Sequence, residues 1–154
     1  LSDKKTYRIP KVSEKRKKKM AQQKEVGTDG EMDKFFEAMR KRMTGRCLFC
    51  NGATEKKNDE TYRHSIAHLL PKRPVNQGGF PSVGTHEENW IELCYYNESC
   101  HTNFDNGTIT WEFIKDSKEW ELIREKLLIV LPAVAEEERR HKLYSRLVEL
   151  VYNK

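Results

Sequence analysis

Hydrophobic residues recur at helical spacing near the start and near the end of the chain. The first run, in which apolar positions are three or four residues apart or adjacent, comprises Phe35, Phe36, Met39 and Met43. Three basic residues, 40–42, lie close to the end of this run, where positive charge suits the helix dipole. The pattern predicts a helix that Thr28 or Asp29 caps and that Gly45 ends.

From Trp111 onward the pattern predicts further helices. One apolar stripe comprises Trp120, Ile123, Leu127 and Val130, and a second comprises Leu143, Leu147 and Leu150. Pro132 separates the two stripes. Apolar stripes of this kind usually pack on the hydrophobic core of their own chain, and we expect that here. The alternative is that they form a dimerisation face or a helix that lies on DNA.

The middle of the chain changes to short alternating runs. Residues 62–70 alternate well enough for a strand that Pro71 stops, and residues 90–93 predict a second short strand. Between them, residues 72–86 contain two prolines and three glycines, which predicts an extended loop. Helices at both ends and strands in the middle indicate an α+β fold.

Two cysteine pairs bracket the predicted strands. Cys47 and Cys50 form the first pair, and Cys94 and Cys100 follow after 43 intervening residues. Zinc prefers tetrahedral thiolate ligation and can replace part of the core that a small domain lacks, so we predict a structural zinc site held by all four. The second pair encloses five residues and needs a longer turn. Two disulfides or unligated buried thiols are the alternatives.

Charge is distributed unevenly along the chain. Residues 1–24 carry ten Lys or Arg and two acidic residues, a net charge of +8, whereas the whole chain is +5. The remaining 130 residues are therefore net −3. We expect residues 1–28 to form a basic arm that contacts nucleic acid, with a solvated tail as the alternative. Its densest run is Lys15, Arg16, Lys17, Lys18 and Lys19.

No apolar run approaches the roughly 18 residues that span a bilayer. No signal-peptide pattern opens the sequence either. We therefore expect a cytoplasmic protein with no membrane partner and no small-molecule cofactor.

The cysteine frame encloses a set of residues typical of one enzyme family. His68 lies in H-S-I-A-H-L-L-P, Asn89 lies five residues before the third cysteine, and His101 and Asp105 follow the fourth. Residues 46–106 resemble the HNH endonucleases of the ββα-metal type, in the subgroup that two cysteine pairs hold together. The I-P-K-V-S-E-K-R stretch resembles the N-terminal segment of bacteriophage-like members.

The resemblance implies a small ββα-metal core with a structural zinc site, flanked by an N-terminal helix and C-terminal helices. The core with its leading helix would cover residues 29–110, and a helical extension would cover residues 111–154. A phage-encoded DNA endonuclease acting within a bacterial host is the function that the resemblance implies.

The resemblance also implies a role for each residue of the set. His68 would be the general base, Asn89 would brace the loop that orients it, and His101 and Asp105 would hold a catalytic ion. Residues at positions i and i+4 lie on one face of a helix and can share an ion. A histidine with a carboxylate suits Mg²⁺, Mn²⁺ or Zn²⁺, and a neutral imidazole suits deprotonation of water. Lys72 and Arg73, just after the base, are candidate phosphate contacts.

Ala67 departs from the family pattern, which has Asp or His as a metal ligand immediately before the base. Substrate phosphate and water would then complete the coordination shell, or His64 or Ser65 would substitute, although His64, four residues before His68 along the strand, is not expected to reach the same ion. A non-catalytic DNA-binding or recombination accessory module with a decayed metal site is the main alternative. A zinc-ribbon protein–protein adaptor is a third hypothesis. His86 is expected to be a loop residue rather than a metal ligand.

Overall fold

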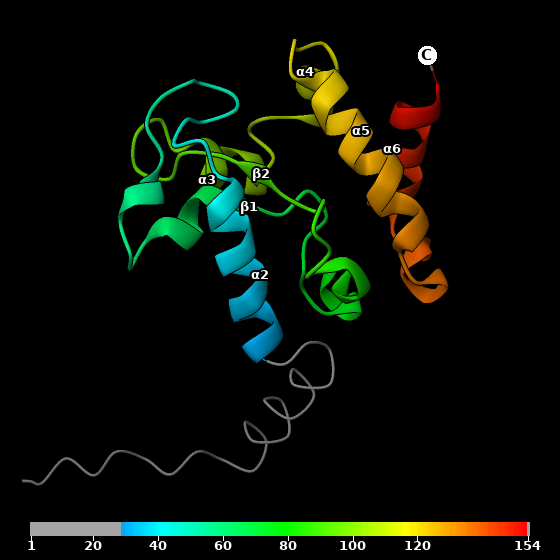
Figure 1. Ribbon diagram of the computed structural model, residues 1–154. Coiled ribbons are helices and arrows are strands. Elements are labelled where there is room, and N and C mark those ends of the chain that lie inside the picture. Colours follow the sequence, from blue (N-terminus) through cyan, green and yellow to red (C-terminus); the bar gives the residue numbers. More distant parts are fainter. Residues whose placement is uncertain (1–28, 154) are drawn as a thin grey trace, which may run out of the picture.

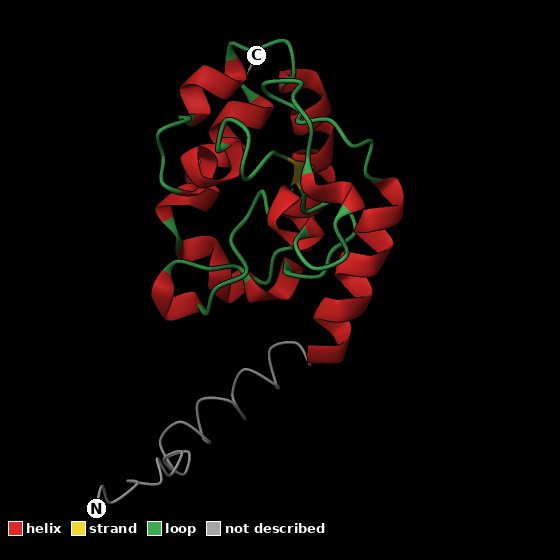
Figure 2. Cartoon of the chain, turned by 90° about the vertical axis from the view of Figure 1, so that its left-hand side faces the viewer, coloured by secondary structure: helices red, strands yellow, loops and turns green. Residues whose placement is uncertain are grey.

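The computed structural model describes residues 29–153, and it combines helices with one small antiparallel sheet (Figures 1 and 2). The elements are α2 (Asp29–Arg42), β1 (Ile66–Ala67), β2 (Ile91–Glu92), α3 (Cys100–Asp105), α4 (Trp111–Lys115), α5 (Trp120–Val130) and α6 (Lys142–Tyr152). The α+β prediction is confirmed at this level. No helix within the described range is long and apolar enough to span a bilayer. The predicted basic arm, residues 1–28, lies outside that range.

Helix α2 forms where the hydrophobic spacing predicts it. Its buried residues pack with Tyr62, Ile66 and Trp90 in one hydrophobic cluster, and they are Phe35, Phe36 and Met39, with Met43 just beyond the helix. The helix ends at Arg42, so Gly45 does not end it. Gly45 lies in the following turn with φ 87°, a conformation that glycine adopts without steric cost.

The long strand predicted over residues 62–70 is wrong. Residues Tyr62–Ser65 form a 3-10 turn, because the Asn58 side chain accepts the Glu60 and Thr61 backbone N–H groups and starts a turn there. Only Ile66–Ala67 pairs with Ile91–Glu92, in the register Ile66↔Glu92 and Ala67↔Ile91. Ser65, Ile66 and Ala67 are all buried, so the alternation of a half-exposed strand is missing.

The C-terminal helices share a core with the cysteine region. Helices α5 and α6 lie side by side (Figure 1). One buried cluster joins their inward residues to the middle of the chain, and its members include Phe80, Leu93, Cys94, Ile123, Leu127, Val130, Leu147 and Val151. The expected packing role of both stripes is therefore confirmed for these positions.

Candidate functional site

The first cysteine pair lies on a tight turn that its own backbone closes. The Asn51 N–H donates to the Cys47 carbonyl over 3.0 Å, and the Cys47 N–H donates to the Gly52 carbonyl over 2.8 Å. Asn51 takes a left-handed conformation with φ 61°, which Asn tolerates better than most residues. A Cβ at Gly52 would collide with the side chain of Asn97, so the two cysteine turns touch at a glycine.

The second cysteine pair lies on the longer turn that enters α3. Ser99 has φ 53°, and the His101 N–H donates to the Cys94 carbonyl over 3.0 Å. The Glu98 N–H points at Cys94 Sγ over 3.4 Å, as the Gly52 N–H points at Cys50 Sγ over 3.3 Å. Amide donors aimed at sulfur stabilise thiolates. Burial opposes ionisation of Cys94, but backbone N–H groups, from Cys100 first, lower the pKa of its thiol.

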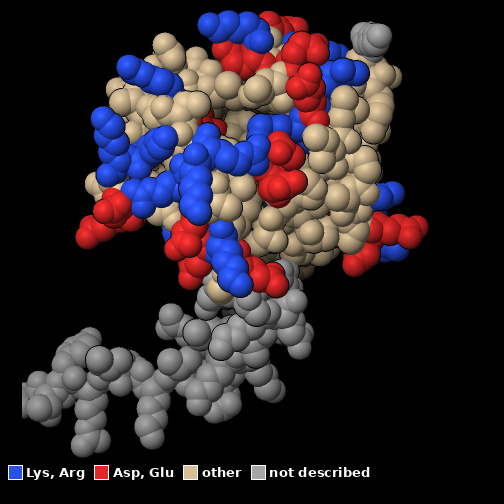
Figure 3. Space-filling view, viewed as in Figure 1, with Lys and Arg blue, Asp and Glu red and all other residues tan. Residues whose placement is uncertain are grey.

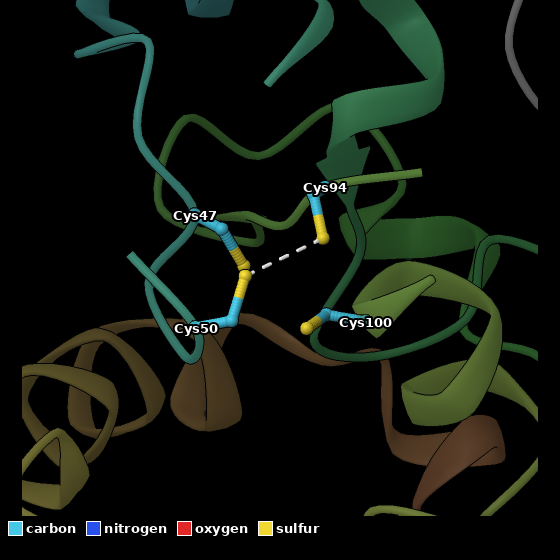
Figure 4. Close-up of side chains that lie close together, drawn as sticks. All are labelled: Cys47, Cys50, Cys94 and Cys100. Atoms are coloured by element: carbon cyan, nitrogen blue, oxygen red, sulfur yellow. Dashed lines mark hydrogen bonds between the residues drawn. The ribbon is translucent and has the colours of Figure 1, made fainter. Parts of the chain in front are cut away.

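The four thiols converge on one point between the turns (Figure 4). All four are unpaired, and their Sγ atoms lie within 4.8 Å of one another. The Sγ atoms of Cys50 and Cys94 are 3.7 Å apart. A tetrahedral ion with thiolate bonds of about 2.3 Å has ligands about 3.8 Å apart, so this set fits one metal ion. None of the four cysteines forms a disulfide bond, so the alternative of two disulfides is not the one that the structure shows.

Helix α3 begins at the last cysteine and carries the His–carboxylate pair. His101 Nε2 lies 3.1 Å from Asp105 Oδ2, and His101 Nδ1 is hydrogen-bonded to the carbonyl oxygen of His64. Adjacent ligands of an octahedral ion with bonds of about 2.1 Å lie about 3.0 Å apart, so the pair is spaced to share one ion. A backbone acceptor on the other ring nitrogen is the usual partner of a metal-binding histidine.

Neighbouring groups change the pKa of His101 even without a bound ion. Burial opposes its protonation, but the bonds to Asp105 and to the His64 carbonyl raise the pKa of His101 above its usual value. An ion at this site would take the place of the Nε2 proton, so binding would release that proton.

His68 follows β1 and lies under α2. Its Nε2 is 2.8 Å from the carbonyl oxygen of Gly84, its ring stacks on Phe35 at 5.2 Å, and Phe36 meets it edge-on at 6.1 Å. Burial against these rings lowers the pKa of His68 to about 4, because the imidazolium form would lose its hydration there. His68 is therefore neutral at physiological pH.

Asn89 is completely buried and joins the two backbone segments that carry His68 and Gly84. Its Oδ1 accepts the Leu70 N–H over 2.8 Å, and its Nδ2 donates to the carbonyls of Leu70 at 3.0 Å and Val83 at 2.9 Å. Because Leu70 lies two residues after His68 and Val83 immediately precedes Gly84, Asn89 holds the imidazole close to its acceptor. An amide is suited to this task, because it both donates and accepts.

Several of the candidate residues line one cleft, which has a volume of about 1100 Å³. His68, His101 and Asp105 line it, together with Lys72 and Arg73. Lys72 and Arg73 are exposed, and their role as phosphate contacts stays a prediction. Arg63 also lines the cleft, ion-paired with Asp33 at 2.9 Å. On the face shown in Figure 3, Lys and Arg gather over and beside α2, next to a hollow in the surface.

Other candidate residues lie elsewhere or act through different atoms. The methyl group of Ala67 lies in the buried core. His64 contributes its carbonyl oxygen to His101 rather than a ring nitrogen, and the Ser65 hydroxyl donates to Glu55. His86 accepts the Glu88 N–H at its Nδ1 over 3.1 Å, which fits a loop role.

Sequence reasoning missed the backbone acceptors and the far wall of the cleft. The carbonyls of His64 and Gly84 carry no side-chain signal that could have identified them. Trp111 and Arg146 line the cleft from the C-terminal region, and Arg146 is ion-paired with Glu112 there. Trp111 and Arg146 are 35 residues apart in the chain, so no spacing in the sequence could have identified this wall.

Comparisons of the chain with family models, curated proteins and solved structures give no match. The function must therefore be argued from the chemistry of these residues.

Proposed function

We propose that this protein is a metal-dependent DNA endonuclease of the HNH type, with a zinc ion held by the four cysteines. One observation carries the proposal: a neutral histidine of fixed orientation shares a cleft with a His–carboxylate pair spaced for one ion. The chain order β1, β2, α3 is that of a ββα-metal core, which supports the same assignment.

The hydrogen bond to Gly84 defines which nitrogen of His68 accepts a proton. A carbonyl oxygen only accepts, so Nε2 carries the hydrogen and Nδ1 keeps its lone pair. His68 takes a proton from water at Nδ1 while the water oxygen attacks phosphorus. The bond from phosphorus to the leaving sugar oxygen breaks, and that oxygen takes a proton from solvent water. The negative charge of a bound phosphodiester raises the pKa of His68 toward the working pH, in the same direction as Asp105 does already.

His101 and Asp105 would hold a Mg²⁺ or Mn²⁺ ion. When bound, such an ion stabilises the charge that develops on the phosphate and on the leaving oxygen. Lys72 and Arg73 bind neighbouring backbone phosphates, and Asn89 keeps the base in place without touching substrate. With alanine at position 67, substrate oxygens and water would complete the coordination shell.

Nicking of supercoiled plasmid in Mg²⁺ or Mn²⁺ tests the proposal. The parent should nick, His68→Ala should not, and His86→Ala should nick like the parent, because His86 serves only a loop. Circular dichroism and zinc content should agree among the three proteins. Equal nicking by His68→Ala would overturn the assignment of the base.

A non-catalytic DNA-binding module is the second candidate, favoured by Ala67. It predicts salt-sensitive DNA binding by the parent without nicking in either metal. The plasmid experiment therefore separates the two candidates.

A further inference from the structure

The long turn between the second pair of cysteines exposes two adjacent tyrosines. Tyr96 is 62% exposed and Tyr95 is 37% exposed. Their rings lie 4.9 Å apart in a T-shaped arrangement, and the ring of His64 lies 4.7 Å from that of Tyr95 and 6.2 Å from that of Tyr96. We call these three residues the aromatic cluster. The candidate metal ligands of this turn are its cysteines, so neither tyrosine side chain is needed to hold the ion.

The turn is fixed to the core beneath it. The Glu55 carboxylate accepts the Tyr96 N–H over 3.0 Å and the Tyr95 N–H over 3.3 Å, and it also accepts the hydroxyl of buried Ser65. Burial disfavours a charged Glu55, but the bonds from Ser65, Tyr96 and Tyr95 lower the pKa of its carboxyl group. The aromatic faces are therefore held in place before any partner arrives, which reduces the entropy lost on binding.

The aromatic cluster borders the candidate ion site. The rings of Tyr95 and His101 are 6.3 Å apart, and both residues line the cleft. The cleft is lined by four Lys or Arg and two carboxylates, of which Glu112 is already paired with Arg146. An anionic backbone with aromatic bases matches this combination of cations and exposed rings better than an apolar peptide does.

We infer that the aromatic cluster stacks an unpaired base next to the phosphate bound in the cleft. The substrate is then DNA with an unpaired strand, such as a single strand, a flap or a branch, and not an uninterrupted duplex. A base inside a duplex has both faces covered by its neighbours, so a stacking surface acts only on a base that has left the stack. This inference rests on the proposed nuclease for the identity of the phosphate.

Binding without added divalent ions tests the inference independently of cleavage. Fluorescence anisotropy would compare one labelled oligodeoxynucleotide as a single strand, as a flap and as a full duplex. Tyr96→Ala should weaken binding of the single strand and the flap roughly 5- to 100-fold and leave the duplex unchanged. Tyr96→Phe should bind like the parent, and Tyr96→Trp at least as tightly. Phe113→Ala, which removes a 61%-exposed aromatic that does not belong to the aromatic cluster, should have no effect.

A 2-aminopurine in the unpaired strand reports stacking directly. Its fluorescence should be quenched by the parent and by Tyr96→Phe but not by Tyr96→Ala. Equal loss of affinity for duplex and single strand, or no loss for either, would overturn the inference. Duplex nicking that is independent of Tyr96 would keep the proposed nuclease and remove its preference for an unpaired strand. Tyr96-dependent single-strand binding without cleavage would keep the aromatic cluster and remove the nuclease.

Discussion

The two candidate metal sites are adjacent in the chain, at Cys100 and His101, yet they are built in opposite ways. The cysteine site draws ligands from two turns that are 43 residues apart and closes on itself, with four sulfur atoms within 4.8 Å. The His101–Asp105 pair comes from a single turn of α3, and the Asp105 side chain is 59% exposed.

This difference follows from what each site must do. A structural ion is most stable when protein ligands fill its whole coordination shell, whereas a catalytic ion needs open positions for substrate and water. The closed site also orients the open one, because the Cys94 carbonyl accepts the His101 N–H at the start of α3. Loss of the cysteine site should therefore remove the His101–Asp105 site, whereas loss of the His101–Asp105 site should leave the cysteine site intact.

The largest expected effect is loss of the cysteine site. Cys47→Ser should abolish zinc binding, unfold the core and eliminate cleavage, because structural zinc contributes about 10–16 kcal/mol, as much as a typical domain's entire stability. Zinc analysis and near-ultraviolet circular dichroism measure the result. Glu98→Ala, an exposed position in the other cysteine turn that reaches the site through its backbone N–H towards Cys94, is the control. A folded parent with less than one zinc per chain would contradict the site.

Asp105→Asn should affect only the open site. An amide oxygen is a weaker ligand than a carboxylate, so we expect cleavage to fall by about 100-fold or more while zinc content and melting temperature stay unchanged. Exposed Asp116, outside the cleft lining, supplies the control Asp116→Asn. Normal cleavage by Asp105→Asn would remove this carboxylate from the ion site.

Sequence reasoning works where the determinants are local. The spacing of Phe35, Phe36 and Met39 identifies α2, and the i, i+4 placement of His101 and Asp105 gives their common face on α3. Both patterns depend on neighbouring residues along one helix, so no tertiary contact is needed to read them.

The remaining features depend on distant contacts. The strand prediction fails at Tyr62–Ser65, because the side chain of Asn58 starts a turn there, and the burial of Ser65, Ile66 and Ala67 removes the alternation that follows. The Gly84 acceptor of His68 comes from 16 residues away, and the Glu55 carboxylate reaches the Tyr96 turn across 41 residues. Backbone acceptors and hydrogen bonds between distant residues produce no periodic pattern in the sequence, so they cannot be predicted from it.

The pH profile tests the base on its own. Neutral His68 is the active form, and burial places its pKa at about 4 in the substrate-free protein, so kcat/KM for cleavage at saturating Mn²⁺ should be flat from pH 7 to pH 5. A histidine with an ordinary pKa of about 6.5 would lose about 25-fold over the same range. Imidazole added to His68→Ala should restore both some cleavage and that ordinary decline. A steep decline in the parent would show that the buried imidazole is not the base.

The smallest effect concerns Glu92, which supports the closed site from β2. Its Oε1 accepts the Thr44 N–H over 2.7 Å, and its Oε2 accepts the Gly45 N–H over 3.0 Å and the Thr54 hydroxyl over 2.7 Å. In Glu92→Gln the new amide nitrogen cannot accept the Gly45 N–H, so the protein should lose about 1–3 kcal/mol of stability. Calorimetry should show a melting point lower by a few degrees per kcal/mol, with one zinc still bound and cleavage unchanged at low temperature. Glu87→Gln, at an exposed position that binds only through its backbone carbonyl, is the control. Unchanged melting of Glu92→Gln would mean that the first cysteine turn keeps its shape without this carboxylate.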